Sequence, residues 1–249
     1  SCGTCSSCRK GRVNACRYNR TLGVQQDGGL AEEIVLPAEK LILNDTLDPR
    51  FLALVEPLSV GFHAVARGRV SLSDRIVVLG CGMIGMGVVI GAVARGAEVI
   101  AVDLSPEKTA LAQRFGARHA INAGTEDVGA RIVELTDDQG VDVAFEAVGL
   151  PETFRQAIDL AGFCGRVVYV GYAKAPVTYQ TQMFNLKELD IMGSRNATRS
   201  DFDAVIDYLK TIGDRAASLI SKTIPFAEAE SALPYWDKNR DVLKVIVER

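Results

Sequence analysis

The chain has 249 residues, of which 48% are hydrophobic and 24% charged, so it can bury a sizeable core as one large domain or two moderate ones. A net charge of −3 and a pI near 5.5 argue against nucleic acid as a partner. No basic segment followed by an apolar one opens the chain, and we therefore expect a cytoplasmic protein with reduced thiols. The chain lacks an initiator Met and starts one residue before its first Cys, from which we expect that it begins partway through a domain.

Four of the six cysteines lie within the first sixteen residues, at Cys2, Cys5, Cys8 and Cys16. Gaps of two, two and seven residues bring four thiolates into one loop, which is the donor set of a closed tetrahedral zinc site. Disulfides are an alternative that the short spacings and a reducing compartment disfavour. An iron–sulfur cluster usually has a shorter last gap followed by Pro, whereas Arg17 follows Cys16. We predict one structural zinc per chain, with no open position for chemistry.

A helix is expected over residues 56–63. Pro57 suits the first turn of a helix, where the Glu56 carboxylate would complement the helix dipole. His63 follows on the same helix, and His119 opens a later strand. We expect both histidines to be structural rather than metal ligands.

Residues 76–94 form an uncharged stretch of nineteen residues, close to the length that spans a bilayer. Five glycines interrupt the stretch, and a second apolar run follows at 99–102. This order predicts a buried parallel strand at 76–79, a turn and a helix rather than a membrane span. The glycine turn, residues 80–85, matches Gly-x-Gly-x-x-Gly at Gly80, Gly82 and Gly85.

The glycine turn predicts a dinucleotide site. Gly80 would permit the tight turn, Gly82 would let a pyrophosphate approach the backbone, and Gly85 would let the next helix pack on the strand. The helix amides and dipole would face the phosphates. Asp103, at the end of the second strand, would accept hydrogen bonds from an adenosine ribose and repel a 2′-phosphate, which favours NAD over NADP.

Six strands are predicted, at residues 76–79, 99–102, 119–121, 141–145, 166–170 and 189–192. Helices between them are expected from Ser105-Pro106 to Phe115, near 126–137 and at 151–161. This alternation predicts an α/β fold with a doubly wound, six-stranded parallel sheet of the Rossmann type, whose ligands lie beyond the carboxyl ends of the strands. After it, Ser200 is expected to cap a helix that ends before Gly213, and 242–247 to form a closing strand.

Three motifs in the chain are similar to motifs of one known enzyme family. The chain resembles the zinc-dependent medium-chain dehydrogenases, on the sorbitol and threonine dehydrogenase side, in Cys2-Gly-x-Cys5-x-x-Cys8-x-x-Gly11-x-x-Asn14-x-Cys16, Asp27-Gly-Gly-Leu-Ala-Glu32 and Glu56-Pro-Leu-Ser-Val-Gly-Phe-His63. The ending Gly193-Ser-Arg-Asn-Ala197 is most similar to the branch that oxidises sugar acids such as galactonate, gulonate or idonate. The resemblance covers essentially the whole chain.

The resemblance implies an enzyme in which a second, catalytic zinc lowers the pKa of the substrate hydroxyl, and hydride passes from a secondary alcohol of a sugar acid or polyol to NAD. It implies that Glu56 lies beside that metal. For the adenosine half and the pyrophosphate of NAD it implies contacts with Ile84, Asp103 and Lys108, although Lys108 could instead be a solvated residue of its helix. For the nicotinamide half it implies contacts with Val170, Gly171, Tyr172, Ser194, Arg195 and Asn196.

The resemblance also implies a domain organisation. Residues 1–58 would be the later part of a GroES-like, β-rich catalytic domain with the zinc lobe, residues 59–194 the NAD-binding domain, and residues 195–249 a return into the catalytic domain. The barrel that supplies the ligands of the catalytic zinc would precede residue 1. A homodimer or homotetramer would pair through the edge strand at 189–193.

The substrate is the least specified feature. Polyol members of the family carry an Arg one place after Arg195 and then an aromatic residue, whereas this chain has Asn196 and Ala197. A sugar acid fits better, because Arg195 could bind its carboxylate bidentately. Two other readings remain: a threonine dehydrogenase-like enzyme, and a non-catalytic, zinc-stabilised NAD-binding module.

Overall fold

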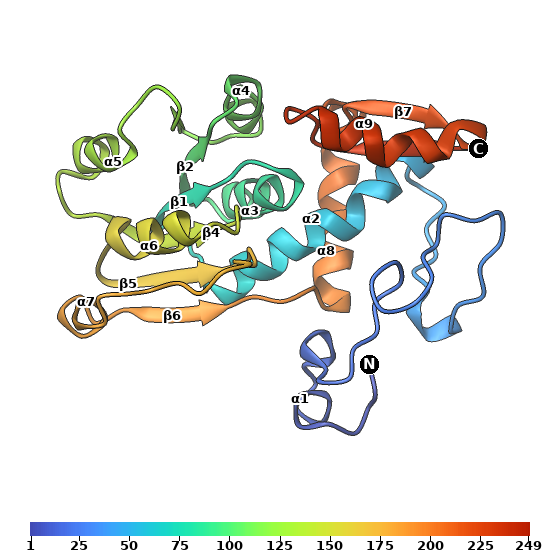
Figure 1. The fold of residues 1–249 in the computed structure, drawn as a ribbon, viewed down its shortest axis with the longest axis horizontal. Coiled ribbons are helices and arrows are strands. Elements are labelled where there is room, and N and C mark those ends of the chain that lie inside the picture. Colours follow the sequence, from blue (N-terminus) through green and yellow to red (C-terminus); the bar gives the residue numbers. More distant parts are fainter.

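The computed structural model describes residues 1–249, and a six-stranded parallel sheet forms its centre (Figure 1). Its strands are β1 Arg75–Leu79, β2 Glu98–Asp103, β3 His119–Asn122, β4 Val141–Glu146, β5 Ala161–Tyr169 and β6 Asp190–Gly193. They lie in the order β3-β2-β1-β4-β5-β6 and all pair in parallel. The predicted doubly wound fold is therefore confirmed. Strand β5 begins at Ala161, earlier than the expected Arg166.

Helices cover both faces of this sheet. The helices of the chain are α1 Ser6–Arg9, α2 Pro49–Arg67, α3 Met83–Val93, α4 Pro106–Arg114, α5 Val128–Thr136, α6 Pro151–Leu160, α7 Gln182–Leu186, α8 Arg199–Ile212 and α9 Ala232–Lys238, of which α1 and α9 lie away from the sheet (Figure 1). Along β1, Ile76 and Val78 belong to the apolar cluster under α2, α3 and α8, whereas Val77 and Leu79 belong to the cluster under α5 and α6. Burial on both faces explains why the strand is apolar without alternation.

The uncharged stretch 76–94 folds as predicted, into β1, the glycine turn and α3. None of the helices in the structure combines the length and the apolar character that crossing a membrane requires.

Helix α2 begins earlier than its sequence signals at Glu56-Pro57 predict. Asp48 is its N-cap and accepts a hydrogen bond from the Arg50 amide at 2.8 Å, and Pro49 occupies the first position. Pro57 therefore lies inside the helix, and the expected helix start at Glu56-Pro57 is wrong, because Asp-Pro already supplies the cap and the fixed φ. The helix runs without interruption through residue 58, so the predicted domain boundary falls within it and stays a prediction.

The C-terminal part of the chain corrects two further expectations. Thr198, not Ser200, caps α8, because its hydroxyl and the Asp201 carboxylate form a reciprocal capping box. The closing strand is β8 Val245–Glu248, which begins three residues later than expected and pairs in parallel with β7 Lys222–Pro225 in a separate two-stranded sheet. Short 3₁₀ helices, η3 Gly213–Leu219 and η4 Phe226–Ser231, connect these elements.

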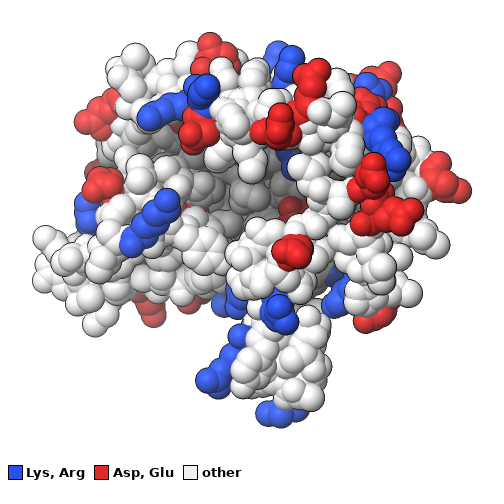
Figure 2. Space-filling view, turned by 45° about the vertical axis from the view of Figure 1, so that its right-hand side comes forward, with Lys and Arg blue, Asp and Glu red and all other residues white.

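Residues 1–48 are mostly irregular, with α1, two 3₁₀ turns (η1 Val13–Ala15 and η2 Ala38–Lys40) and one isolated bridge. We call residues 1–16 the cysteine lobe. It projects from the body of the molecule beside α8 (Figure 1). Residues 1–26 contain five basic residues and no acidic one, and Lys and Arg are visible on the projecting part at the bottom of Figure 2.

Candidate functional site

The glycine turn connects β1 to α3, and each of its three glycines has the geometry that its expected role requires. Gly80 has a φ of 93°, in the region that favours glycine. A Cβ on Gly85 would lie 1.8 Å from the Gly80 carbonyl oxygen, whereas a Cβ on Gly82 would meet no atom within 4 Å. Gly82 caps α3 without a side-chain hydrogen bond, which leaves the first-turn amides and the positive end of the dipole available to an anion.

The Asp103 carboxylate fastens the glycine turn to the end of β2. Its Oδ2 accepts a hydrogen bond from the Cys81 amide at 2.7 Å, and its Oδ1 accepts one from the Ser105 amide at 2.9 Å. Asp103 is only half-buried, and each carboxylate oxygen has a second lone pair. Asp103 can therefore hold the turn and still accept a hydrogen bond from a ribose hydroxyl.

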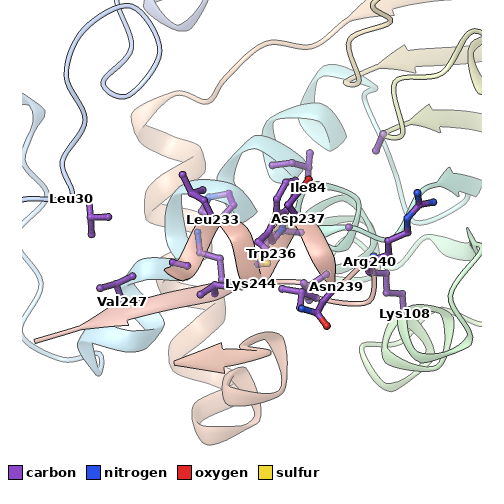
Figure 3. A pocket seen from close by; sticks show the side chains of 18 residues that line it. Leu30, Ile84, Lys108, Leu233, Trp236, Asp237, Asn239, Arg240, Lys244 and Val247 are labelled. Carbon is purple, nitrogen blue, oxygen red and sulfur yellow. The ribbon is translucent and has the colours of Figure 1, made fainter. Parts of the chain in front are cut away.

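A cleft of about 1040 Å³ opens in front of the glycine turn (Figure 3). Of the predicted cofactor residues, Gly82, Ile84 and Lys108 line it. The opposite wall comes from α9, β8 and the segment between them. It includes Trp236, Arg240 and Lys244, which no sequence motif indicates.

Lys108 reaches across one end of this cleft. Its Nζ donates a hydrogen bond to the Arg240 carbonyl oxygen at 2.5 Å. Lys108 is therefore not simply a solvated residue of α4, since it connects the nucleotide fold to the C-terminal segment. No motif in the sequence links residues 232–247 to the glycine turn, which is why that wall was missed.

The ends of β4 and β5 lie beside the cleft rather than in its lining. The amides of Val170 and Gly171 both donate to the Glu146 carbonyl oxygen, at 2.9 and 3.0 Å. A Cβ on Gly171 would lie 2.4 Å from Oε2 of the buried Glu146 side chain, so only glycine fits there. Tyr172 is largely exposed. These three predicted residues form one group next to residues 147–149.

The loop of residues 194–196, which follows β6, faces the cysteine lobe. The Ser194 amide donates to the Tyr169 carbonyl oxygen at 2.8 Å. The Arg195 guanidinium donates to the Cys16 carbonyl oxygen at 3.4 Å, and Asn196 Nδ2 donates to the Asn14 carbonyl oxygen at 2.9 Å. Asn196 adopts a left-handed φ of 51°. The structure thus places these three predicted residues between the sheet and the cysteine lobe.

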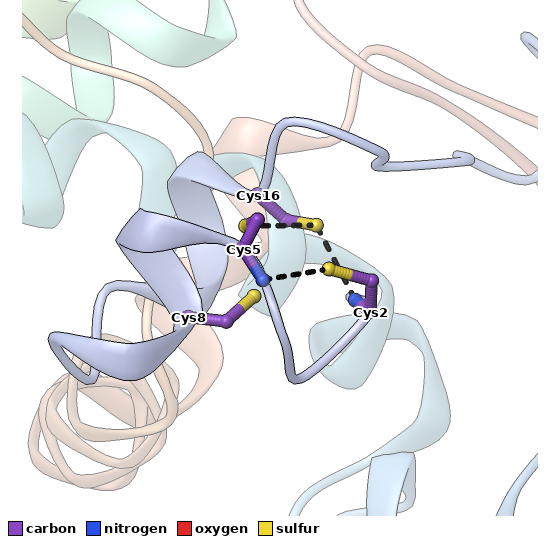
Figure 4. Close-up of side chains that lie close together, drawn as sticks. All are labelled: Cys2, Cys5, Cys8 and Cys16. Atoms are coloured by element: carbon purple, nitrogen blue, oxygen red, sulfur yellow. Dashed lines mark hydrogen bonds between the residues drawn. The ribbon is translucent and has the colours of Figure 1, made fainter.

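The four cysteines of the lobe converge as predicted (Figure 4). Their Sγ atoms all lie within 4.8 Å of one another, and those of Cys5 and Cys16 are 3.9 Å apart. Zn–S bonds of about 2.3 Å give sulfur–sulfur separations of about 3.8 Å in a tetrahedron. All six cysteines are free, so the structure forms no disulfide. The donor set and its spacing fit a zinc ion.

Hydrogen bonds and burial shift the pKa values of two of these thiols in opposite directions. The Ser7 hydroxyl, with nearby backbone amides, lowers the pKa of Cys5 to about 5. Burial, with the neighbouring thiols, raises the pKa of Cys8 to about 11. Cysteines bind metal as thiolates, so metal binding would release protons from this cluster.

Glu56 lies in the middle of α2, with its side chain exposed and in no hydrogen bond or ion pair. Its alternative role as a helix-start carboxylate is wrong, because the helix begins at Pro49. His63 is buried and structural, with Nδ1 at 2.8 Å from Asp201 Oδ2 and Nε2 at 3.0 Å from Asn14 Nδ2. His119 opens β3, as expected.

Comparison with known proteins identifies the family. Residues 84–211 match the zinc-binding dehydrogenases. The chain belongs to the zinc-binding dehydrogenase family. It is 30% identical to the L-galactonate-5-dehydrogenase of Escherichia coli strain K12, over 99% of the chain and 73% of that protein. It is 31% identical to a sorbitol dehydrogenase of Halalkalibacterium halodurans, over 98% of the chain and 70% of that protein.

Solved structures agree with this assignment. One is a short chain alcohol dehydrogenase from Escherichia coli CFT073, complexed with NADH. The match covers 100% of the present chain and 74% of that chain, with a TM-score of 0.92 and 27% identity. A zinc-binding dehydrogenase from Sinorhizobium meliloti 1021, bound to NADP, matches the same shares with a TM-score of 0.89 and 31% identity. The resemblance to zinc-type dehydrogenases is confirmed, and the chain is an oxidoreductase of the alcohol dehydrogenase kind.

Proposed function

We propose that this zinc-binding dehydrogenase uses NAD to oxidise a secondary alcohol of a sugar acid or polyol. The observation that carries the proposal is the cleft, since Gly82 leaves open space in front of the uncapped N-terminus of α3. That arrangement suits a pyrophosphate. The names of the relatives support the substrate class, because they include galactonate and sorbitol dehydrogenases.

The residues around the cleft would divide the binding of NAD among them. The amides of Met83 and Ile84 would meet the pyrophosphate, and the half-buried Asp103 would accept a hydrogen bond from the adenosine ribose. Val170–Tyr172 and the 194–196 loop, at the ends of β5 and β6, would flank the nicotinamide half. Arg240 and Lys244, on the opposite wall, would add positive charge near the phosphates. Bound NAD would accept a hydride from the alcohol carbon.

The cysteine lobe would hold one structural zinc through Cys2, Cys5, Cys8 and Cys16. Four thiolate ligands close the coordination sphere, so this zinc would stabilise the lobe and perform no chemistry. These four cysteines are the sole group of three or more metal-ligating side chains close enough together to hold an ion. No second set of ligands accompanies Glu56, and its place beside a catalytic zinc stays an expectation.

A binding and turnover assay tests the proposal. Trp236 is the chain's single tryptophan and lines the cleft, so energy transfer from it to bound NADH reports binding directly. We expect NADH to bind more tightly than NADPH, and one or more sugar acids or polyols to reduce NAD. Reduction by L-threonine alone would favour the threonine dehydrogenase reading. NADH binding with no turnover of any alcohol would favour the non-catalytic module, and no binding would contradict the proposal.

We also propose that copies of the chain pair through the edge of the large sheet. Strand β6 bonds only to β5, and Ile191 on it is partly exposed, so its outer edge can accept a second strand. Light scattering on the purified chain would give a dimer or tetramer, and a monomer at all concentrations would contradict the pairing.

A further inference from the structure

We propose that Asn14 is a positioning residue through which the cysteine lobe fixes the 194–196 loop, so that metal occupancy of the lobe controls how tightly the nicotinamide half of NADH is held. This inference rests on the proposed function in one respect, the assignment of the 194–196 loop to the nicotinamide half. The contacts that carry it are independent of that assignment.

Asn14 connects the cysteine lobe to the nucleotide fold through hydrogen bonds. Its Nδ2 donates to the Arg195 carbonyl oxygen at 2.9 Å and lies 3.0 Å from His63 Nε2. The main-chain carbonyl oxygen of Asn14 accepts a hydrogen bond from Asn196 Nδ2 at 2.9 Å. One residue of the lobe therefore holds the loop from both sides, through the main chain of Arg195 and the side chain of Asn196.

The orientation of the Asn14 amide follows from these partners. A carbonyl oxygen can only accept, so the Arg195 contact requires NH₂ at that position. The second proton of the amide then points to His63 Nε2 as acceptor, and His63 Nδ1 donates to Asp201 Oδ2 at 2.8 Å. The chain of hydrogen bonds thus continues from the lobe through α2 to the first turn of α8, where Asp201 caps the helix.

Few other bonds hold the lobe in place. Five hydrogen bonds join residues 1–16 to residues beyond 20, and three of them involve Asn14. The other two are the Arg195 bond to the Cys16 carbonyl and an exposed bond between Lys40 and Ser1. Within the lobe only Asn14 and Cys16 are buried. The lobe lacks an apolar core of its own, so its shape depends on what the four thiolates bind.

The loop itself needs an external support. Asn196 has a φ of 51°, a left-handed conformation that asparagine adopts more readily than most residues other than glycine, and contacts with the surroundings favour it further. The surroundings that hold it here are Asn14 and its neighbours. Loss of metal would release the lobe, remove Asn14 from the loop and let residues 194–196 relax. The glycine turn makes none of these contacts, so the adenosine half of the site would be unaffected.

Calorimetric titration with NADH and with ADP-ribose, which lacks the nicotinamide, separates these effects. In the metal-loaded chain, Asn14→Ala should weaken NADH binding about tenfold, the equivalent of one or two lost hydrogen bonds, and leave ADP-ribose binding unchanged. Asn14→Asp keeps the side-chain size but cannot donate to the Arg195 carbonyl, so it should also weaken NADH binding about tenfold and leave ADP-ribose binding unchanged. Asn19→Ala is the matched control, because the Asn19 side chain bonds only to the Thr21 hydroxyl, and the substitution should change neither affinity.

Metal removal by a chelator completes the test. It should weaken NADH binding in the wild-type chain at least to the level of Asn14→Ala. In that variant the further effect should be smaller than in wild type, because only the bonds of the loop to the main-chain carbonyls of Asn14 and Cys16 are left to lose. Unchanged NADH affinity in both Asn14 variants would overturn the inference, as would an equal loss for NADH and ADP-ribose. If the wild-type chain binds neither ligand, the proposed function fails. Hydrogen exchange of residues 194–198 then decides the inference alone, with faster exchange in Asn14→Ala and in the metal-free chain expected and unchanged exchange contradicting it.

Discussion

Gly82 and Gly85 lie three residues apart in one turn, yet a methyl group would meet different surroundings at the two positions. At Gly85 it would collide with the Gly80 carbonyl oxygen at 1.8 Å, whereas at Gly82 it would enter open space, and the Gly82 φ of −63° suits any residue. We expect Gly82→Ala to change the free energy of unfolding by less than about 0.5 kcal/mol but to weaken NADH binding by about tenfold or more, or about 1.4 kcal/mol, because the methyl group occupies the space for the pyrophosphate.

Gly85→Ala is the contrasting variant. Its methyl group would force the turn open, and we expect a loss of about 1–3 kcal/mol of unfolding free energy. Urea unfolding and NADH titration of both variants check the pair of predictions. Gly82→Ala binding NADH as tightly as wild type would mean that the pyrophosphate does not approach the turn there.

At the scale of elements, the close crossing of α2 and α3 positions the glycine turn. A Cβ on Gly61 would lie 2.3 Å from the Gly87 carbonyl carbon and 2.4 Å from the Val88 amide nitrogen. Backbone atoms cannot rotate away as a side chain can, so the two helices would have to separate. We expect Gly61→Ala to lower the free energy of unfolding by about 1–3 kcal/mol, measured by urea denaturation.

Gly82→Ala is a control of the same chemistry, because a Cβ there meets nothing within 4 Å. Its unfolding free energy should stay within about 0.5 kcal/mol of wild type. Equal stability of both variants would show that the helices can move apart without cost.

The elements also show what the sequence could and could not predict. The strands of the large sheet were predictable, because burial on both faces leaves continuous apolar runs such as residues 76–79. The start of α2 was misplaced although Asp48-Pro49 is an adequate signal, since Pro57 carried a similar one. The glycine turn and the four cysteines are local motifs and were found. The contact of Asn14 with Arg195 joins residues 181 positions apart, and the wall around Trp236 has no motif, so neither could be deduced from spacing.

At the scale of the whole molecule, the Asp201 carboxylate connects three parts of the fold. Its Oδ2 accepts a hydrogen bond from His63 on α2 at 2.8 Å. It also accepts hydrogen bonds from the Thr198 amide at 2.8 Å and the Thr198 hydroxyl at 2.6 Å. His63 in turn contacts Asn14 of the cysteine lobe. Burial alone would raise the pKa of Asp201, but the hydrogen bonds from His63 and Thr198 outweigh it, and the pKa is lowered from 3.8.

This pKa shift predicts the pH dependence of stability. A carboxyl whose pKa is lower in the folded state stabilises the fold fully above its unfolded pKa and loses that contribution as the pH falls through the folded pKa. Asp201→Asn should therefore cost about 1.5–3 kcal/mol at pH 7, and the difference from wild type should shrink as the pH drops below about 4.

Asp207→Asn is the matched control on the same helix. Asp207 is exposed and faces only Lys210, at 3.6 Å, so its removal should cost less than about 1 kcal/mol. Urea unfolding of the three chains from pH 7 to pH 3 measures both differences. No difference between Asp201→Asn and wild type at any pH in this range would mean that the Asp201 charge does not hold α2, α8 and the lobe together, and that its role is the geometry of the helix cap, which an amide oxygen also supplies.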